Sequence, residues 1–421
     1  MKINKHCFPN GLRLVHYEDT STQMVALNIV YDVGARDEHP EHTGFAHLFE
    51  HLMFGGSAHI PDYDTPLQLA GGENNAWTNN DITNYYLTVP KPNVETAFWL
   101  ESDRMLELAF SEQSLEVQRG VVMEEFKQRC LNQPYGDVGH LFRPLAFRVH
   151  PYRWPTIGKE LSHIEQATLD EVKSFFYRFY APNNAVLAVT GNISWDETVK
   201  LTEKWFAPIP RRDVPVRQLP QEPEQTQERR LTVERNVPLD ALFMGYHMCS
   251  REGADYYAFD ILSDILSNGR SSRLNRRLVQ EQNIFSGIDA YISGTRDAGL
   301  LQISGKPAAG VSLEQAEAAV RKELEELQRS PVDGQELEKV KNKFESTQIF
   351  GNINYLNVAT NLAWFELTGK AEDIDLEVER YRSVTTEQLH TVAQRTFCES
   401  NAVVLYLSLI HISEPTRHAQ I

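Results

Sequence analysis

Two histidines and a glutamate stand close together in residues 43–57, TGFAHLFEHLMFGGS. His47 and His51 are four positions apart, so on a helix both imidazoles project from one face, with Glu50 beside them. Zinc accepts histidine nitrogen and carboxylate oxygen, and a catalytic zinc site has three protein ligands and one open position for water. The pattern therefore predicts a metal-binding helix whose glutamate stays off the metal as a general base.

The same residues also fit a buried amphipathic helix, with Leu48, Leu52 and Met53 in a core and the histidines near its edge. That alternative is weaker, because burying two histidines and a glutamate without a partner costs free energy. A purely structural zinc site is also disfavoured, since such sites are normally closed by four Cys or His ligands. The order His-x-x-Glu-His is the inverse of the HExxH motif of zinc peptidases, which favours a hydrolytic site.

A third ligand is expected from the acidic pair Glu124 and Glu125, which lies in a helix predicted over residues 114–131. Helical periodicity does not choose between the two. Glu125 shares a face with Gln118, Val121 and Val122, and Glu124 shares one with Val117, Gly120 and Val121. Either glutamate could instead lie on a solvated helix face, so both remain candidates on the residues alone.

Strands and helices alternate around these residues. Strands are predicted over 24–35, 82–90 and 184–193, and helices over 94–110 and 169–182. Residues 209–228 are rich in Pro, Gln and charge without an apolar period, which predicts an extended linker. The sequence thus predicts two α+β domains, one over residues 1–208 and one over residues 229–406.

The second half repeats the order strand, polar turn, apolar helix and glycine. When the two halves are aligned on Gly56 and Gly269, His47 falls opposite Asp260, Glu50 opposite Ser263 and His51 opposite Asp264. We therefore expect a duplicated fold in which the second domain has no metal site.

Composition narrows the possible partners. The chain has 421 residues and a formal net charge of −17, which argues against a nucleic-acid partner. Four distant cysteines predict free thiols. No signal peptide and no apolar run long enough to span a membrane is seen, so a cytoplasmic location is expected. Residues 407–421 contain LSLIHISEPTR, which looks like a translated sequencing adapter, and we expect this tail to be an artefact.

Several segments together resemble the M16 peptidases, a family that includes pitrilysin, insulin-degrading enzyme and the mitochondrial processing peptidase. The resemblance runs from residue 1 to about 406 and is to the short, two-domain bacterial type. It rests on HLFEH, on the glutamate about 74 residues later in VVMEEF, and on GGENNAWTNNDITNYY (71–86), HPYRWPTIGKELSHI (150–164) and YAPNNAVLAVTGNI (180–193). It implies two homologous α/β-sandwich domains, each with an antiparallel-rich sheet and helices packed on one side.

The resemblance also implies roles for individual residues. His47, His51 and Glu125 are expected to hold one Zn²⁺ per chain, with Glu50 as the base of an endopeptidase that cleaves peptides or unfolded polypeptide segments. Gln118, where many members have glutamate, and Glu124 are expected beside the ligands rather than on the metal. Asn75, Ala76, Trp77 and Thr78 match an edge strand that pairs with the substrate backbone. On the residues alone, this segment reads as a polar loop.

One feature of active members is missing. Their second half carries an Arg and a Tyr, seven positions apart, that reach the substrate carbonyl, and the matching positions here are Val279 and Ser286. A shifted alignment would bring Arg277 and Phe285 there instead. The chain supplies only two domains, so a homodimer or a heterodimer with another M16 subunit is expected. The alternative is a non-catalytic or partner-dependent subunit.

Overall fold

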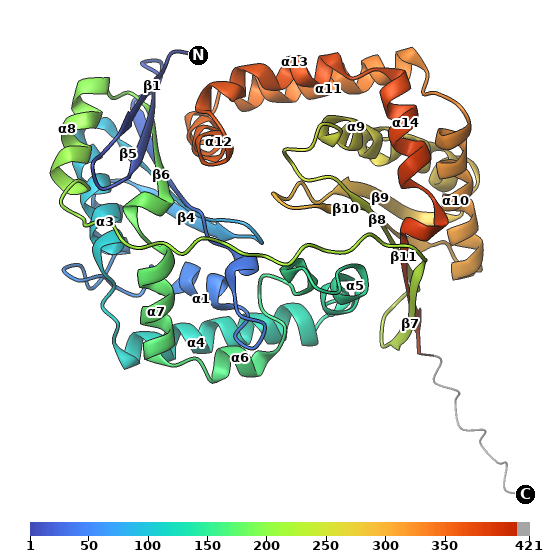
Figure 1. The fold of residues 1–421 in the computed structure, drawn as a ribbon, viewed down its shortest axis with the longest axis horizontal. Helices are drawn as coiled ribbons and strands as arrows, with labels where there is room; N and C mark the ends of the chain where they lie inside the picture. The colour runs from blue at the N-terminus through green and yellow to red at the C-terminus, as the bar shows by residue number, and fades with distance from the viewer. Residues whose placement is uncertain (411–421) are drawn as a thin grey trace, which may run out of the picture. The chain divides into compact units, whose positions relative to one another are not determined.

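The computed structural model describes residues 1–410, which form two compact units (Figure 1). The first unit contains residues 1–129, 147–222 and 341–383. The second contains residues 130–146, 223–340 and the described residues from 384 onward. Most of the predicted artefact lies outside the described residues, although residues 407–409 belong to the last strand. Each half of the chain therefore contributes a segment to the unit formed mainly by the other half.

The first unit is built on a six-stranded sheet with the order β1-β2-β6-β3-β5-β4. The β2–β6 pair is parallel and the other pairs are antiparallel. β4 has a neighbour on one side only and forms an edge. The strands are β1 (Ile3–Cys7), β2 (Arg13–Glu18), β3 (Met24–Tyr31), β4 (Glu73–Thr78), β5 (Thr83–Pro90) and β6 (Ala185–Gly191).

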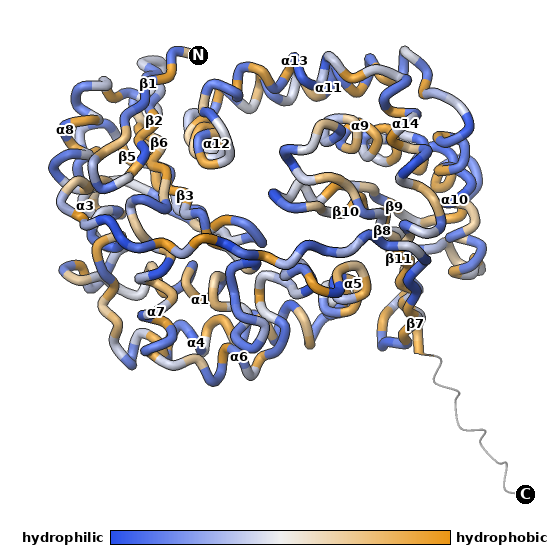
Figure 2. Tube along the Cα trace, in the orientation of Figure 1, coloured by the Kyte–Doolittle hydropathy of each residue, from blue (hydrophilic) through white to orange (hydrophobic). Residues whose placement is uncertain are grey.

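The central strands of this sheet are apolar on both faces, as the colouring of β3 and β6 in Figure 2 indicates. Leu187 and Val189 of β6 belong to a large core on one face, whereas Val186 and Ala188 belong to a separate core on the other. Successive side chains of a strand point to opposite faces, so this continuous apolar run matches a sheet that is covered twice.

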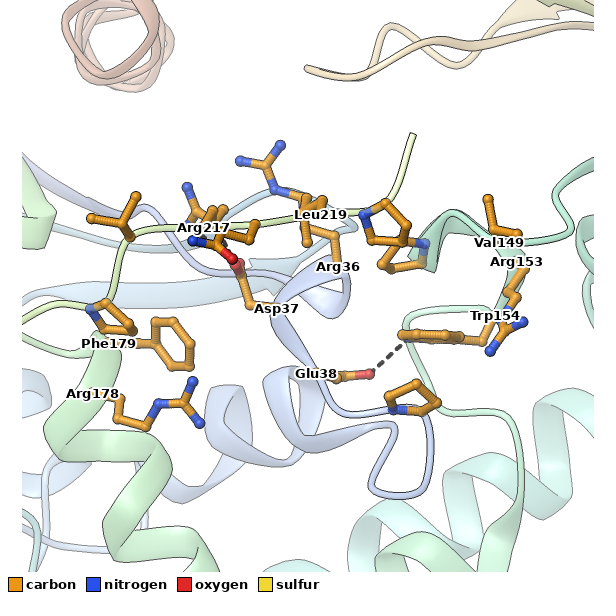
Figure 3. A pocket seen from close by; sticks show the side chains of 16 residues that line it. Arg36, Asp37, Glu38, Val149, Arg153, Trp154, Arg178, Phe179, Arg217 and Leu219 are labelled. Atoms are coloured by element: carbon orange, nitrogen blue, oxygen red, sulfur yellow. Dashed lines mark hydrogen bonds and ion pairs between the residues drawn. The ribbon is translucent and has the colours of Figure 1, made fainter. Parts of the chain in front are cut away.

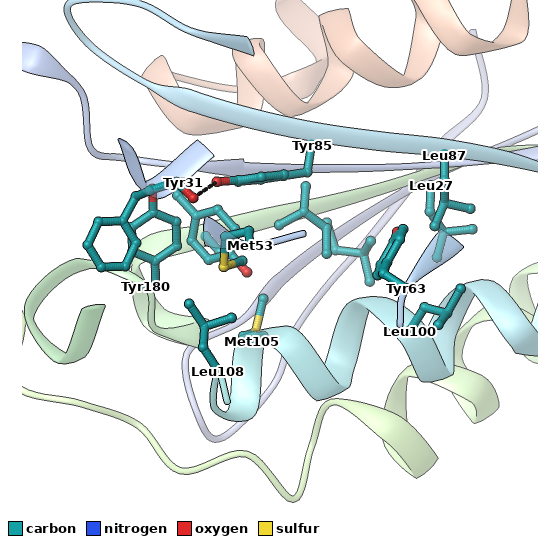
Figure 4. Packing of buried hydrophobic residues seen from close by; sticks show 14 of the residues in the cluster. Leu27, Tyr31, Met53, Tyr63, Tyr85, Leu87, Leu100, Met105, Leu108 and Tyr180 are labelled. Atoms are coloured by element: carbon teal, nitrogen blue, oxygen red, sulfur yellow. Dashed lines mark hydrogen bonds between the residues drawn. The ribbon is translucent and has the colours of Figure 1, made fainter. Parts of the chain in front are cut away.

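Helices from residues 1–208 pack on the first face, where they enclose the core shown in Figure 4. They are α1 (Phe45–Leu52), α3 (Val94–Leu106), α7 (Leu169–Phe179) and α8 (Trp195–Trp205). The opposite face is covered by α12 (Tyr355–Thr368), which comes from the second half of the chain. The helices of residues 1–208 thus lie on one side of the sheet, as expected. The other side is covered as well, by α12, which the expectation did not include.

The second unit repeats the arrangement with five strands in the order β7-β11-β8-β10-β9. Its first pair is parallel and the others are antiparallel, which reproduces the β2-β6-β3-β5-β4 part of the first sheet. The strands are β7 (Arg229–Arg235), β8 (Ala241–Met248), β9 (Phe285–Ile292), β10 (Gly299–Pro307) and β11 (Ala402–Leu409). The predicted duplication is therefore visible in strand order and direction.

Helices from both halves of the chain also pack in this unit. α9 (Tyr256–Ser267), α10 (Leu313–Arg329) and α14 (Thr386–Thr396) contact its strands, and so does α5 (Val138–Ala146) from the first half. Phe142 of α5 lies against Gly245 of β8, where a β-carbon would come within 2.8 Å of its ring. The predicted class, two mixed α/β domains, is confirmed.

The remaining α-helices lie between the elements described above along the chain. They are α2 (Asp64–Leu69), α4 (Glu112–Phe126), α6 (Leu161–Glu165), α11 (Gly334–Gly351) and α13 (Glu377–Ser383), and a π-helical turn, Lys127–Leu131, continues α4. The four cysteines form no disulfide. Within residues 1–410, no helix has the length and apolar character that crossing a membrane requires. The expected cytoplasmic location stays a prediction.

Residues 210–226 form neither helix nor strand, in keeping with an extended linker. Its part up to residue 222 is nevertheless fixed to the first unit. Arg217 is paired with Asp32 and Asp37, and the carboxylate of Glu222 accepts hydrogen bonds from the backbone N–H groups of residues 148–150.

Candidate metal centre

Helix α1 carries the histidine motif and begins at a glycine. Gly44 has φ of +88°, a conformation that favours glycine, and it has no side chain to cap the helix. The carboxylate of Glu38 caps it instead, accepting hydrogen bonds from the N–H groups of Gly44 at 3.0 Å and Ala46 at 2.9 Å. Trp154 donates a further bond to Glu38, which Figure 3 shows. The start of α1 is thereby fixed.

The motif residues project from α1 toward α4. Nε2 of His47 lies 3.5 Å from Oε2 of Glu125, and Nε2 of His51 lies 3.3 Å from the same oxygen. All three ligand atoms lie within 4.8 Å of one another, and no other group of three His, Cys, Asp or Glu residues converges in this way within residues 1–410. The structure brings together the three residues that the resemblance selected.

Glu124, the other candidate of the acidic pair, is engaged elsewhere. Its Oε1 lies 2.6 Å from Nζ of Lys127, and its side chain is largely exposed. Gln118 is half-buried and packs near Gly55, just beyond α1. Their expected places beside the metal stay predictions.

The electrostatic surroundings suit a divalent cation. Burial lowers the pKa of His47 to about 4, so its imidazole is neutral and has a lone pair to offer at neutral pH. A hydrogen bond from His51 lowers the pKa of Glu125, which keeps that carboxylate ionised. Two imidazole nitrogens and one carboxylate oxygen are a donor set that zinc accepts in catalytic sites. The residues present therefore fit a zinc ion.

Glu50 differs from Glu125 in its surroundings. Burial raises the pKa of Glu50, and a hydrogen bond from Thr78 partly opposes this rise. Thr78 is the last residue of the edge strand β4. Residues 75–78, which on the residues alone read as a loop, thus form a strand, as the resemblance implied, and this strand ends beside the glutamate of the motif.

The free edge of β4 carries a backbone donor that the sheet does not use. The N–H of Ala76 bonds to Oδ1 of the neighbouring Asn75 at 2.8 Å. The N–H of Asn79, three positions later, points inward and donates to the carbonyl of Ile82. Since N–H groups alternate in direction along an antiparallel strand, this donor faces the open edge. β4 is therefore able to accept another extended chain.

The structure also shows which contacts are made by the residues at, and next to, the expected Arg and Tyr positions of the second half. Nη1 of Arg277 lies 2.7 Å from Glu323 and is also paired with Glu326. Phe285 is fully buried, and Oγ of Ser286 donates to the carbonyl of Lys306 at 3.1 Å. A shifted alignment therefore does not restore the pair, because Arg277 is held by two carboxylates and Phe285 is in the core.

A pocket of about 260 Å³ lies between the linker and the loop that precedes α1 (Figure 3). Its walls include Asp37, Glu38, Trp154 and Phe179, and Arg217 of the linker closes one side. His47, His51 and Glu125 do not line it. The pocket lies where the linker packs on the first unit, and it is separate from the three expected metal ligands.

Three partners of the motif were not found in the sequence. Glu38 lies in the loop just before α1 and Thr78 lies in β4, and neither has a spacing that marks it as a partner of the motif. Arg129, whose Nη2 lies 2.9 Å from Oε1 of Glu125, follows that residue by four positions. That helical spacing is a recognisable pattern for an ion pair.

Comparison with known proteins identifies the chain. A model described as "Insulinase (Peptidase family M16)" matches residues 13–137, and one described as "Peptidase M16 inactive domain" matches residues 166–344. Together they cover more than half of the chain. The chain belongs to peptidase family M16. The second match agrees with the finding that no such triad converges within residues 229–410.

Relatives of this M16 chain are named as zinc proteases. "Zinc protease PqqE" of Helicobacter pylori is 26% identical over 404 residues, covering 94% of this chain and 91% of the relative. "Uncharacterized zinc protease YmxG" of Bacillus subtilis is 25% identical, covering 96% and 98%. The crystal structure of a protease from Helicobacter pylori matches with a TM-score of 0.92 and 26% identity, covering 97% of this chain and 99% of that one.

Proposed function

We propose that this M16 chain is a zinc-dependent endopeptidase that hydrolyses peptides or unfolded polypeptide segments, with Glu50 as the general base. The proposal rests on one observation, the convergence of His47, His51 and Glu125 near Glu50. These three residues supply three ligand atoms, so Glu50 is left to act as a base. The names of the relatives, zinc proteases, support the same chemistry.

Each residue then has a defined task. His47, His51 and Glu125 would hold the zinc ion, which when bound acidifies a water molecule and polarises a carbonyl. Glu50 accepts the proton of the attacking water and passes it to the leaving amine. Thr78 lies near the Glu50 carboxylate and opposes the rise in its pKa.

Substrate is held through its main chain in this proposal. Residues Asn75–Thr78 lie on the edge strand, and the outward N–H of Ala76 is available once Asn75 releases it. An extended peptide that adds to β4 runs past Glu50, because Glu50 on α1 lies beside Thr78 at the end of that strand. Such binding uses hydrogen bonds to the peptide backbone, so substrates of varied sequence can bind.

A partner-dependent subunit is the second candidate. Arg277 is held by Glu323 and Glu326, and neither Val279 nor Ser286 supplies the missing Arg–Tyr function. In that case a homodimeric or heterodimeric M16 partner would provide the donor for the developing oxyanion.

Three matched glutamate substitutions test the main proposal. Glu50→Gln is expected to abolish peptide hydrolysis while one equivalent of zinc stays bound, because the base is lost and the ligands are kept. Glu125→Gln is expected to lose both zinc and activity, and Glu124→Gln to keep both. Peptide cleavage, its inhibition by a chelator, and zinc content are measured for each. Full activity in Glu50→Gln would refute the assignment of the base.

The same measurements separate the two candidates. Chelator-sensitive cleavage by the purified chain alone supports an autonomous peptidase. A chain that holds zinc but cleaves nothing supports a partner-dependent subunit.

A further inference from the structure

The two carboxylate oxygens of Glu125 have different partners. Oε2 faces Nε2 of His47 and Nε2 of His51, whereas Oε1 lies 2.9 Å from Nη2 of Arg129. Arg129 follows Glu125 by one helical turn, within the π-helical turn Lys127–Leu131 that ends α4. Arginine presents its N–H groups in a rigid planar fork, so its contact restricts the rotation of a carboxylate.

That restriction matters for a metal with an open position. Carboxylates bind metals through one oxygen or through both. A hydrolytic zinc site needs three protein ligand atoms and a place for water, and a glutamate that binds with both oxygens competes for that place. We infer that Arg129 is a positioning residue of the metal centre, which holds Oε1 of Glu125 so that this carboxylate gives the metal one oxygen only. The inference rests on the proposed zinc site.

Two other roles for Arg129 make different predictions. Its side chain is 68% exposed, and an exposed ion pair contributes at most about 1 kcal/mol to stability. A role in the fold alone would therefore leave the coordination of a bound metal unchanged. A role in attracting the metal is opposed by its charge, which has the same sign as the ion.

The test compares Arg129→Met, Arg129→Lys and the control Lys127→Met in the full chain. Lys127 forms a similar ion pair with Glu124 at the same end of α4. Lys127→Met therefore removes such a contact from a glutamate that is not an expected metal ligand. The visible absorption of Co²⁺ bound in place of zinc reports coordination number without any hydrolysis. Zinc affinity by chelator competition and kcat at saturating zinc complete the set.

Arg129→Met is expected to weaken the visible Co²⁺ bands, as the second oxygen of Glu125 becomes a fourth protein ligand atom, and to keep or increase zinc affinity. Its kcat falls by about tenfold or more, which is the scale for residues that orient metal ligands. Arg129→Lys keeps one charged donor and retains most of the parent spectrum, and Lys127→Met matches the parent throughout.

Other results would overturn the inference. They are an unchanged Co²⁺ spectrum in Arg129→Met, a loss of zinc affinity with unchanged coordination, or an equal effect from Lys127→Met. If the parent chain binds Co²⁺ but cleaves no peptide, the spectra still decide the role of Arg129, although the proposed hydrolysis fails. If the parent binds neither metal, both proposals fail together.

Discussion

Glu50 and Glu125 are two glutamates beside the same pair of histidines, and their surroundings separate their roles. Burial raises the pKa of Glu50, which favours a group that takes up a proton. The hydrogen bond from His51 lowers the pKa of Glu125, which favours a permanent anion and hence a ligand. The sequence shows equal carboxylates, and only the contacts distinguish base from ligand.

A buried arginine shows how charge is tolerated in the core of the first unit. Arg104 is 1% exposed, and its Nε donates to Glu101 at 3.0 Å. Its guanidinium lies 4.5 Å and 4.6 Å from the ring centroids of Tyr85 and Tyr63, two residues labelled in Figure 4. It also faces Phe54, which follows α1, so it links α3 to the end of α1.

Arg104→Met is expected to destabilise the first unit by about 3–5 kcal/mol, because it leaves the carboxylate of Glu101 buried without its cation. The double variant Arg104→Met with Glu101→Gln should recover part of this loss, since the uncompensated charge is then gone. Urea unfolding followed by circular dichroism measures both variants. A double variant no more stable than the single one would show that the aromatic packing, and not the charge, dominates.

At the scale of elements, the proposed site depends on an edge strand, β4, that lies beside the helix α1. α1 contacts β4, and Thr78 at the end of β4 lies near Glu50, where it opposes the rise in the pKa of that glutamate. A loop could carry the same residues, but it would not present a row of backbone groups in a fixed register. The edge position of β4 is therefore what allows the proposed binding of a peptide backbone.

Ala76→Pro removes the outward N–H of β4, and a proline is tolerated on an edge strand when its nitrogen faces outward. We expect kcat/KM for peptides to fall by about tenfold or more, on the scale of one lost hydrogen bond of ~1.5 kcal/mol. Ala76→Val keeps the N–H and is the control. Cleavage kinetics and the melting temperature are compared. Native kinetics in a stably folded Ala76→Pro protein would exclude this strand as the binding site.

At the scale of the whole molecule, the duplicated halves exchange equivalent helices. α5 follows α4 in the first half and packs in the second unit, whereas α12 follows α11 in the second half and packs in the first unit. Val358, Leu362 and Ala363 of α12 cover the face of the first sheet that carries Val15 and Val186. Neither linear half therefore contains a complete core.

A fragment of residues 1–228 is expected to aggregate or to bind a hydrophobic dye, because it lacks α12 and exposes one apolar face of its sheet. Supplying residues 341–383, fused through a flexible linker, should restore solubility and lower dye binding. Light scattering and dye fluorescence compare the two fragments. A monomeric, cooperatively unfolding fragment of residues 1–228 would contradict this dependence on the exchanged helix.

The sequence by itself determined the local features of this protein. Histidines four positions apart lie on one helix face wherever that helix forms, and alternating or continuous apolar runs predict strands such as β3 and β6. The repeated order of elements also predicted a second fold copy without a metal triad. These features depend on geometry within a short stretch of chain, which residue spacing records.

Tertiary structure decided which distant residues meet. Helical periodicity left Glu124 and Glu125 equal, and the packing of α4 against α1 turned Glu125 toward the histidines and left Glu124 to Lys127. The resemblance had selected Glu125, but the residues alone had not. The edge position of β4, the bond from Trp154 to the capping Glu38 and the exchange of α12 likewise depend on contacts between segments far apart in the chain. Such contacts are set by how whole faces pack, and spacing along the sequence does not encode them.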